Sequence, residues 1–220
     1  MKNKKVLSMI AALGLVAVVG IGGTLAYFND RTENLTNTFT MAEQGIEMEL
    51  WESSVMADGE GGYRQNERGP KVVAGTDEGI SYEDLQPGAD VYKDPTITIK
   101  ANSVDCYVYA SITTKNDAKN TFTVDTAWSE ITEASTDNED GTTTKYYVYG
   151  TVDTPTEVER NAADQNLTPL FTNVDIAADV TNVKEELGDI VIKSSAVQAS
   201  NIEANEAQSE GLGLLGYVVE

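Results

Sequence analysis

The sequence predicts an all-β protein, built as an antiparallel β-sandwich of Greek-key or jelly-roll type with long loop insertions and one or two short helices. Six segments alternate apolar with polar residues at period two and are rich in β-branched and aromatic side chains, as half-buried strands are. Turn residues, mainly Pro, Gly, Asn and Asp, separate several of these segments. No internal period of about 20–50 residues is present, so a repeat architecture is not expected.

The first 26 residues have the anatomy of a secretory signal peptide. Three lysines within the first five residues are followed by an uncharged, mostly apolar run at 6–26. Thr24 and Ala26 are the small residues that precede a cleavage site, so we expect the cut between Ala26 and Tyr27. The alternative is an uncleaved membrane anchor, because 21 uncharged residues are long enough to span a bilayer.

Cleavage would leave a single domain at 27–220, whose 194 residues are enough for one core. The signal removes three lysines and no acidic residue, so 12 basic and 36 acidic residues remain and the net charge is −24. Nucleic acids and anionic membranes require neutralising Lys and Arg, so we expect neither as a partner. Contact with a membrane is expected only through the uncleaved signal.

The expected strands all show the period-two pattern, and in the first of them three apolar residues alternate with two glutamates. Pro87-Gly88 predicts a tight turn, while Asn116-Asp117 and residues 138–141 each predict a hairpin end between two strands. The strands expected in chain order are 46–51, 96–100, 104–114, 122–128, 146–152 and 190–198.

Two stretches show little periodicity. Residues 53–80 are rich in Gly, Glu and Asp, which predicts a long exposed insertion. Residues 155–188 hold two prolines and one short helical segment at 184–187. A second helix of about two turns is expected at 201–209, ending before Gly211.

The composition excludes several kinds of active site. Histidine is absent, which excludes His-based zinc sites, the Ser-His-Asp triad and the Cys-His dyad in their usual forms. The acidic run at 136–147 fails as a calcium loop, because Thr136 and Tyr147 stand where the loop requires carboxylates. Glu47 and Glu49 lie on an alternating segment and indicate a solvated face rather than a catalytic pair. We therefore expect no metal, no organic cofactor and no enzymatic activity.

The one cysteine, Cys106, lies in a strand-like stretch and is expected to be buried and unpaired. The alternative is an intermolecular disulfide, which an odd cysteine in a secreted protein permits.

Five tyrosines are concentrated on two of the expected strands. Cross-strand aromatic pairing is the ordinary explanation. The alternative is a face that binds carbohydrate or collagen. The five are Tyr107, Tyr109, Tyr146, Tyr147 and Tyr149.

Several segments are similar to one known family. The most specific is Gly-Gly-Thr-Leu-Ala-Tyr-Phe-Asn-Asp at 22–30, followed by Thr-Phe-Thr at 38–40. The internal ones are Leu-Gln-Pro-Gly at 85–88, Lys-Asp-Pro at 93–95, Pro-Leu-Phe at 169–171 and the segment 190–199. Together they resemble the TasA and camelysin-like proteins of Gram-positive bacteria, whose precursors are cut by a signal peptidase of the SipW type.

The resemblance implies a jelly-roll subunit, secreted to the cell surface or extracellular matrix of a Gram-positive bacterium, where it forms fibres of the biofilm matrix. In TasA-like fibres the mature N-terminal segment of one subunit inserts as a strand into the next. Here that segment is 27–40, and Leu35, Thr38 and Phe39 are the candidate inserted positions. The implied partners are the SipW-type signal peptidase and further copies of the chain.

Two other functions remain open at this point. One is a secreted metalloendopeptidase of the camelysin type, and the other is a monomeric surface adhesin that binds its ligand through loops. The sequence contains no recognisable catalytic constellation for a peptidase. A structural role is therefore the primary expectation.

Overall fold

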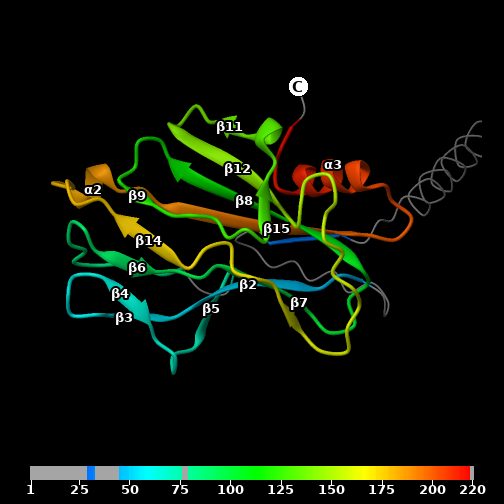
Figure 1. Ribbon diagram of the computed structural model, residues 1–220, viewed down its shortest axis with the longest axis horizontal. Coiled ribbons are helices and arrows are strands. Elements are labelled where there is room, and N and C mark those ends of the chain that lie inside the picture. The colour runs from blue at the N-terminus through cyan, green and yellow to red at the C-terminus, as the bar shows by residue number, and fades with distance from the viewer. Residues whose placement is uncertain (1–28, 33–44, 76–78, 219–220) are drawn as a thin grey trace, which may run out of the picture.

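The computed structural model describes residues 29–32, 45–75 and 79–218, which form mostly antiparallel β-strands with a few short helices (Figure 1). The expectation of an all-β protein is confirmed for this part of the chain. Strands lie in two layers, and one longer helix covers the outer side of one layer (Figure 1).

Sheet A forms one layer and contains the longest strands. Its order is β1-β15-β8-β12-β10, with β11 also paired to β12, and all of its pairs are antiparallel. The central position of β8 explains why six of its ten residues are buried, since both of its faces are covered. The strands are β1 Asn29–Thr32, β8 Cys106–Lys115, β10 Trp128–Glu130, β11 Thr136–Asp137, β12 Thr142–Tyr149 and β15 Ile190–Gln198.

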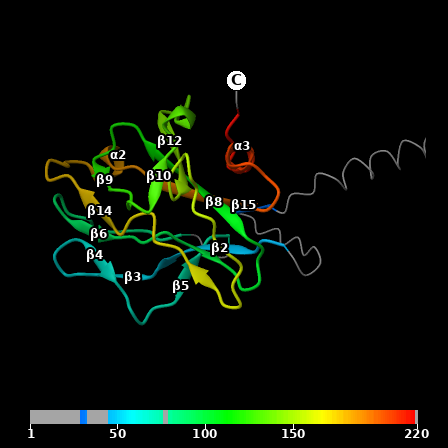
Figure 2. The same ribbon diagram turned by 45° about the vertical axis from the view of Figure 1, so that its right-hand side comes forward.

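Sheets B and C make up the other layer (Figure 2). Sheet B has the order β13-β7-β2-β5, and sheet C has the order β3-β4-β6-β14-β9 with one parallel pair, β4 with β6. The strands of sheet B are β2 Met48–Ser53, β5 Lys71–Val73, β7 Thr96–Ile99 and β13 Gln165–Asn166. Those of sheet C are β3 Val55–Ala57, β4 Tyr63–Gln65, β6 Asp90–Tyr92, β9 Asn120–Thr121 and β14 Asn173–Ile176.

The main core lies between the two layers. Period-two alternation places every second residue of β8 on this side, where Val108 and Ala110 are fully buried. Leu50 and Ile97 of sheet B and Ile176 of sheet C belong to the same cluster. Burial of each large apolar side chain stabilises the fold by about 1.5–3 kcal/mol, which makes this cluster the principal source of stability.

A second, smaller core lies on the opposite face of sheet A, beneath helix α3 (Ala204–Leu214). Tyr109 and Val197 face the helix, and Ser195 Oγ donates a hydrogen bond of 2.8 Å to the carbonyl of Gly211. Only glycine fits at position 211, because a Cβ there would lie 2.3 Å from the Tyr109 ring. The remaining helices are α2 (Val183–Glu186) and a 3-10 turn, η1 (Thr132–Ala134).

The structure confirms several elements expected from the pattern. The strand at 190–198 has the expected bounds, and those at 96–100 and 104–114 differ by one or two residues. Residues 138–141 join the paired strands β11 and β12, and Gly88 has the positive φ of 82° that the turn after Pro87 requires.

Other expectations were wrong. Residues 122–127 form no strand, because Asp125 makes a local turn by accepting the Ala127 N–H and Phe122 stacks on Phe171 at 4.3 Å. Asn116-Asp117 is a turn but not a hairpin end, since the next strand, β9, pairs with β14 instead of β8. The interval 53–80, expected to be an insertion without strands, contains β3, β4 and β5.

Candidate assembly edge, groove and outer face of sheet B

Strand β15 pairs with a different strand on each of its two edges, and the two pairings differ in length. On one side β8 pairs with it along its whole length, from Ile190 to Gln198. On the other side β1 pairs antiparallel with only four residues, in a register that sets Asn29 opposite Val197 and Thr32 opposite Ser194. In the part of the chain that the structure describes, no strand pairs with the outer edge of residues 190–193. Within the described ranges, half of this edge is therefore unpaired.

A groove lined by both apolar and polar residues lies beside this half of the edge. Its volume is about 970 Å³, and it runs between β15 of sheet A and β5 of sheet B. Leu50, Val91 and Ile176 line it and also belong to the main core, so the groove opens directly onto the interior. Residues 187–192 form its wall on the side of sheet A, and Val191 is 48% exposed. The arrangement can receive an extended segment that offers main-chain bonds to the edge and apolar side chains to the groove.

The site residues expected from the sequence fall outside the described ranges. Ala26 and Tyr27 at the expected cleavage point, and Leu35, Thr38 and Phe39 of the expected inserted segment, all belong to residues 1–28 and 33–44. Among the residues that the structure does describe, no helix is both long and apolar enough to cross a membrane.

Cys106 is buried and unpaired, as expected. Burial, with a smaller contribution from the nearby carboxylate of Asp105, raises the pKa of its thiol to about 12. Its backbone exchanges two hydrogen bonds with Val158, which fixes the residue at the start of β8.

The acidic loops use their carboxylates within their own turns. Asp140 accepts hydrogen bonds from the backbone N–H and the hydroxyl of Thr142, and these bonds lower the pKa of its carboxyl. Asp58 accepts the N–H groups of Glu60 and Gly62 in the same way. Within the described ranges, no three Cys, Asp or Glu side chains come together as a metal site would need.

The tyrosines divide between the two faces of sheet A. Tyr146 faces α3 and contacts the ring of Tyr217, whereas Tyr147 belongs to the main core. Tyr149 makes an edge-to-face contact of 5.1 Å with its cross-strand partner Trp128. Adjacent residues of a strand point to opposite faces, so the five tyrosines form no single binding face.

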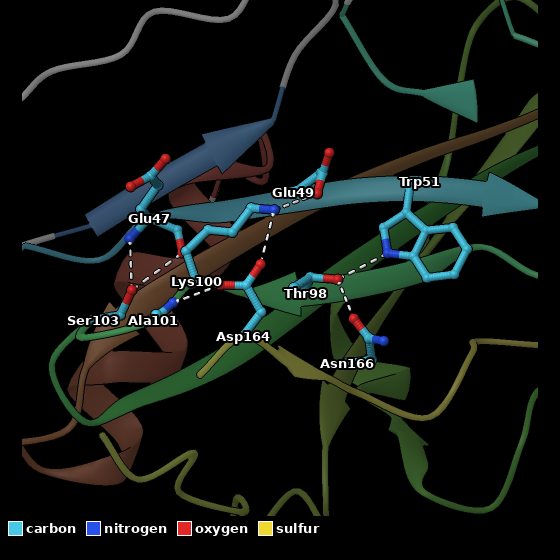
Figure 3. Close-up of polar contacts among 9 residues, drawn as sticks. All are labelled: Glu47, Glu49, Trp51, Thr98, Lys100, Ala101, Ser103, Asp164 and Asn166. Carbon is cyan, nitrogen blue, oxygen red and sulfur yellow. Dashed lines mark hydrogen bonds and ion pairs between the residues drawn. The ribbon is translucent and has the colours of Figure 1, made fainter. Parts of the chain in front are cut away.

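A network of polar side chains covers the outer face of sheet B, away from the core (Figure 3). Lys100 Nζ lies 2.5 Å from Glu49 Oε2 and 3.3 Å from Asp164 Oδ2. The hydrogen bond to Glu49 raises the pKa of Lys100. The pKa of Asp164 is lowered, first by the N–H of Ala101 and then by Lys100.

Trp51 lies on the same face (Figure 3). Its Nε1 donates to Thr98 Oγ1 at 2.8 Å, and the Thr98 hydroxyl donates to Asn166 Oδ1 at 2.7 Å. The ammonium of Lys71 lies 3.5 Å from the centroid of the Trp51 ring. The two glutamates near Trp51 were expected to form a solvated face, and this constellation was not expected from the sequence. The alternation Glu-Met-Glu-Leu-Trp indicates that the glutamates and the tryptophan share one face of a strand. It does not indicate which residues of the neighbouring strands lie beside them.

The fold and the groove define a class: a mostly antiparallel β-protein with a groove beside a strand edge that is only partly paired in the described residues. Comparison with protein-family models, with curated proteins and with solved structures found no match.

Proposed function

We propose that this protein is a secreted structural subunit of jelly-roll type, which assembles into fibres at a bacterial cell surface or in a biofilm matrix. The observation that carries the proposal is the outer edge of β15 at residues 190–193, with which no described strand pairs and which borders the groove. In the fibre, the segment 27–40 of one subunit takes this edge in the next subunit and replaces that subunit's own β1 at residues 194–197.

The register of β1 defines how such a segment would pair with β15. Asn29 lies opposite Val197, and antiparallel pairing moves the partner back by one residue for each residue forward. A segment from a second copy that extends the same register brings Leu35 opposite Val191, whose exposed side chain lies on the same side of sheet A as Val197. The same register brings residues 34 and 36 opposite Ile192 and Ile190, which line the groove and pack against the main core.

Strand addition of this kind has a sound physical basis. The incoming backbone satisfies N–H and C=O groups that the edge leaves open, and alternate side chains fill the groove.

Disulfide trapping between two separately purified variants tests the proposal. Mature Leu35→Cys is mixed with mature Val191→Cys under mild oxidation, and the heterodimer is measured by mass spectrometry. The native Cys106 is buried and does not compete. Rapid heterodimer formation is the expected result.

The matched control replaces Val191→Cys with Val152→Cys, which is also exposed but lies in the loop after β12. Equal trapping at both positions, or none at position 191 while fibres still form, contradicts strand addition at β15.

A further inference from the structure

The outer face of sheet B presents three cross-strand rows of side chains. Trp51 stands in the first row, Glu49 and Asn166 flank Thr98 in the second, and Lys100 lies in the third (Figure 3). Successive rows are two residues apart along the strands, which is roughly 7 Å. The face is thus an extended strip, with an aromatic ring at one end and hydrogen-bonding groups along the rest.

Trp51 offers the face of its ring to this surface. Its Nε1–H is already satisfied by the buried hydroxyl of Thr98, so no polar group of the indole is left to bind water. Exposed Lys71 lies over the ring, which shows that the ring can be approached from the solvent side. A flat, partly exposed tryptophan of this kind is a typical anchor for a ligand with an apolar face.

The second row supplies free hydrogen-bonding capacity next to the ring. Asn166 is exposed and uses its Oδ1 to accept from Thr98, whereas its Nδ2 donates no hydrogen bond to any described residue. Glu49 uses one carboxylate oxygen for Lys100 and keeps the other available. The amide donor and the carboxylate acceptor stand on either side of Thr98, two strand spacings or about 9–10 Å apart, so they can bind different hydroxyl groups of a sugar chain.

The charges on this face are balanced. Glu49 and Asp164 are both paired to Lys100, and the ring itself is covered by a lysine. The face therefore has no array of free cations for a polyanion, and the high negative charge of the chain repels one. The ligand that fits is uncharged and rich in hydroxyl groups.

We propose that the outer face of sheet B binds a neutral, unbranched hexose polymer, with one sugar ring stacked on Trp51 and the next bound by Asn166 and Glu49. Trp51 also lines the groove beside β15, but sugar binding on the outer face does not depend on strand addition. In such binding the sugar displaces the Lys71 ammonium from the ring.

Tryptophan fluorescence tests the proposal directly, because the chain has only two tryptophans and the other, Trp128, is buried in the core. The mature protein is titrated with a linear β-linked glucose hexasaccharide, and affinities are checked by calorimetry. We expect saturable binding below about 1 mM. Trp51→Ala should weaken it by at least about tenfold and Asn166→Ala by about fivefold, since each removes a direct contact.

Lys71→Ala gives a change of opposite sign: binding should tighten by about two- to fivefold, because the cation no longer competes for the ring. The control is Tyr107→Ala on sheet A, which should leave the affinity unchanged. Asn166 and Lys71 are exposed, so these variants remain informative if Trp51→Ala fails to fold.

Absence of saturable binding overturns the proposal. The proposal is also overturned if the Asn166→Ala and Trp51→Ala variants bind the glucan as tightly as the parent protein does. Tighter binding of a polyuronate than of the glucan overturns it as well. Loss of fibres has no bearing on this test, and loss of glucan binding has none on strand addition.

Discussion

At the scale of the residue, two fully buried side chains of β8 show how tightly sheet A is packed. Cys106 faces the main core, and Tyr109 faces α3. The Tyr109 hydroxyl makes no hydrogen bond in the described structure, and burial raises its pKa. The two positions therefore report separately on the two cores.

Cys106 should react slowly with thiol reagents in the native protein. A pKa of about 12 leaves roughly one thiol in ten thousand ionised near pH 8, and only the thiolate reacts. Labelling with a chromogenic disulfide should become rapid once denaturant is added. Prompt labelling of native protein, or a dimer lost on reduction, would instead support an intermolecular disulfide.

Gly211→Ala should destabilise the protein by about 1–3 kcal/mol, because its Cβ would press into the Tyr109 ring and lift α3. The matched control is Gly213→Ala in the same helix, where a Cβ meets nothing within 4 Å. That change should stabilise by about 0.5–1 kcal/mol through helix propensity. Urea denaturation measures both, and equal effects would show that α3 does not pack on Tyr109 in solution.

At the scale of the element, the long alternating strands could be predicted from the sequence and the short ones could not. β8 and β15 bury whole faces, so their period-two pattern is strong. β5 and β13 have two or three residues and exist because a neighbouring strand supplies their partners. Helix α3 runs on through Gly211, past the end expected, because close packing on Tyr109 outweighs the poor helix propensity of glycine.

The candidate sites were harder to predict than the strands. The pattern placed Glu49 and Trp51 on an exposed face, but Asn166 comes from a two-residue strand far along the chain. The groove likewise combines β5 with β15, and their proximity depends on the packing of two layers. Contacts between residues far apart in the sequence could not be predicted in this way, since the period-two pattern describes the two faces of one strand and not its neighbours.

Glu186 should make the stability of the α2 region depend on pH. Hydrogen bonds from Lys119 first, and then from Thr181 and Asn182, lower its pKa from 4.5 to about 2. A lowered pKa in the folded state stabilises above the unfolded value, and this contribution disappears as pH falls from 4.5 to about 2. Glu186→Gln should therefore be less stable than the parent near neutral pH and equal to it near pH 2.

Chemical denaturation over a pH series measures this difference. Glu185→Gln is the control, because the Glu185 carboxylate makes none of those contacts in the described structure. A difference for Glu186→Gln that persists unchanged at the acidic end would assign its effect to packing rather than charge.

At the scale of the whole molecule, charge should govern assembly. Mature subunits carry a net charge of −24 and repel one another over about 8–10 Å at physiological ionic strength. Added salt, divalent cations or a pH near the isoelectric point of 4.2 should therefore promote fibres, as followed by light scattering and electron microscopy.

The matched variant lacks residues 27–40. It should remain a folded monomer that forms no fibres under the same conditions, because the buried residues described in the main core lie between Met48 and Ala196. Fibres of the same form from this variant would place the contact between subunits elsewhere.

The pairing of β1 with β15 also has a consequence for timing. The two strands join residues that are 162 to 168 positions apart, one strand near the beginning of the chain and the other near its end. In a protein exported N-terminus first, β1 is translocated early. It cannot pair until β15 has also been translocated, which requires almost the entire polypeptide. A partly translocated chain thus has no β15 edge, and the strand addition that we propose at β15 requires a completely translocated acceptor chain.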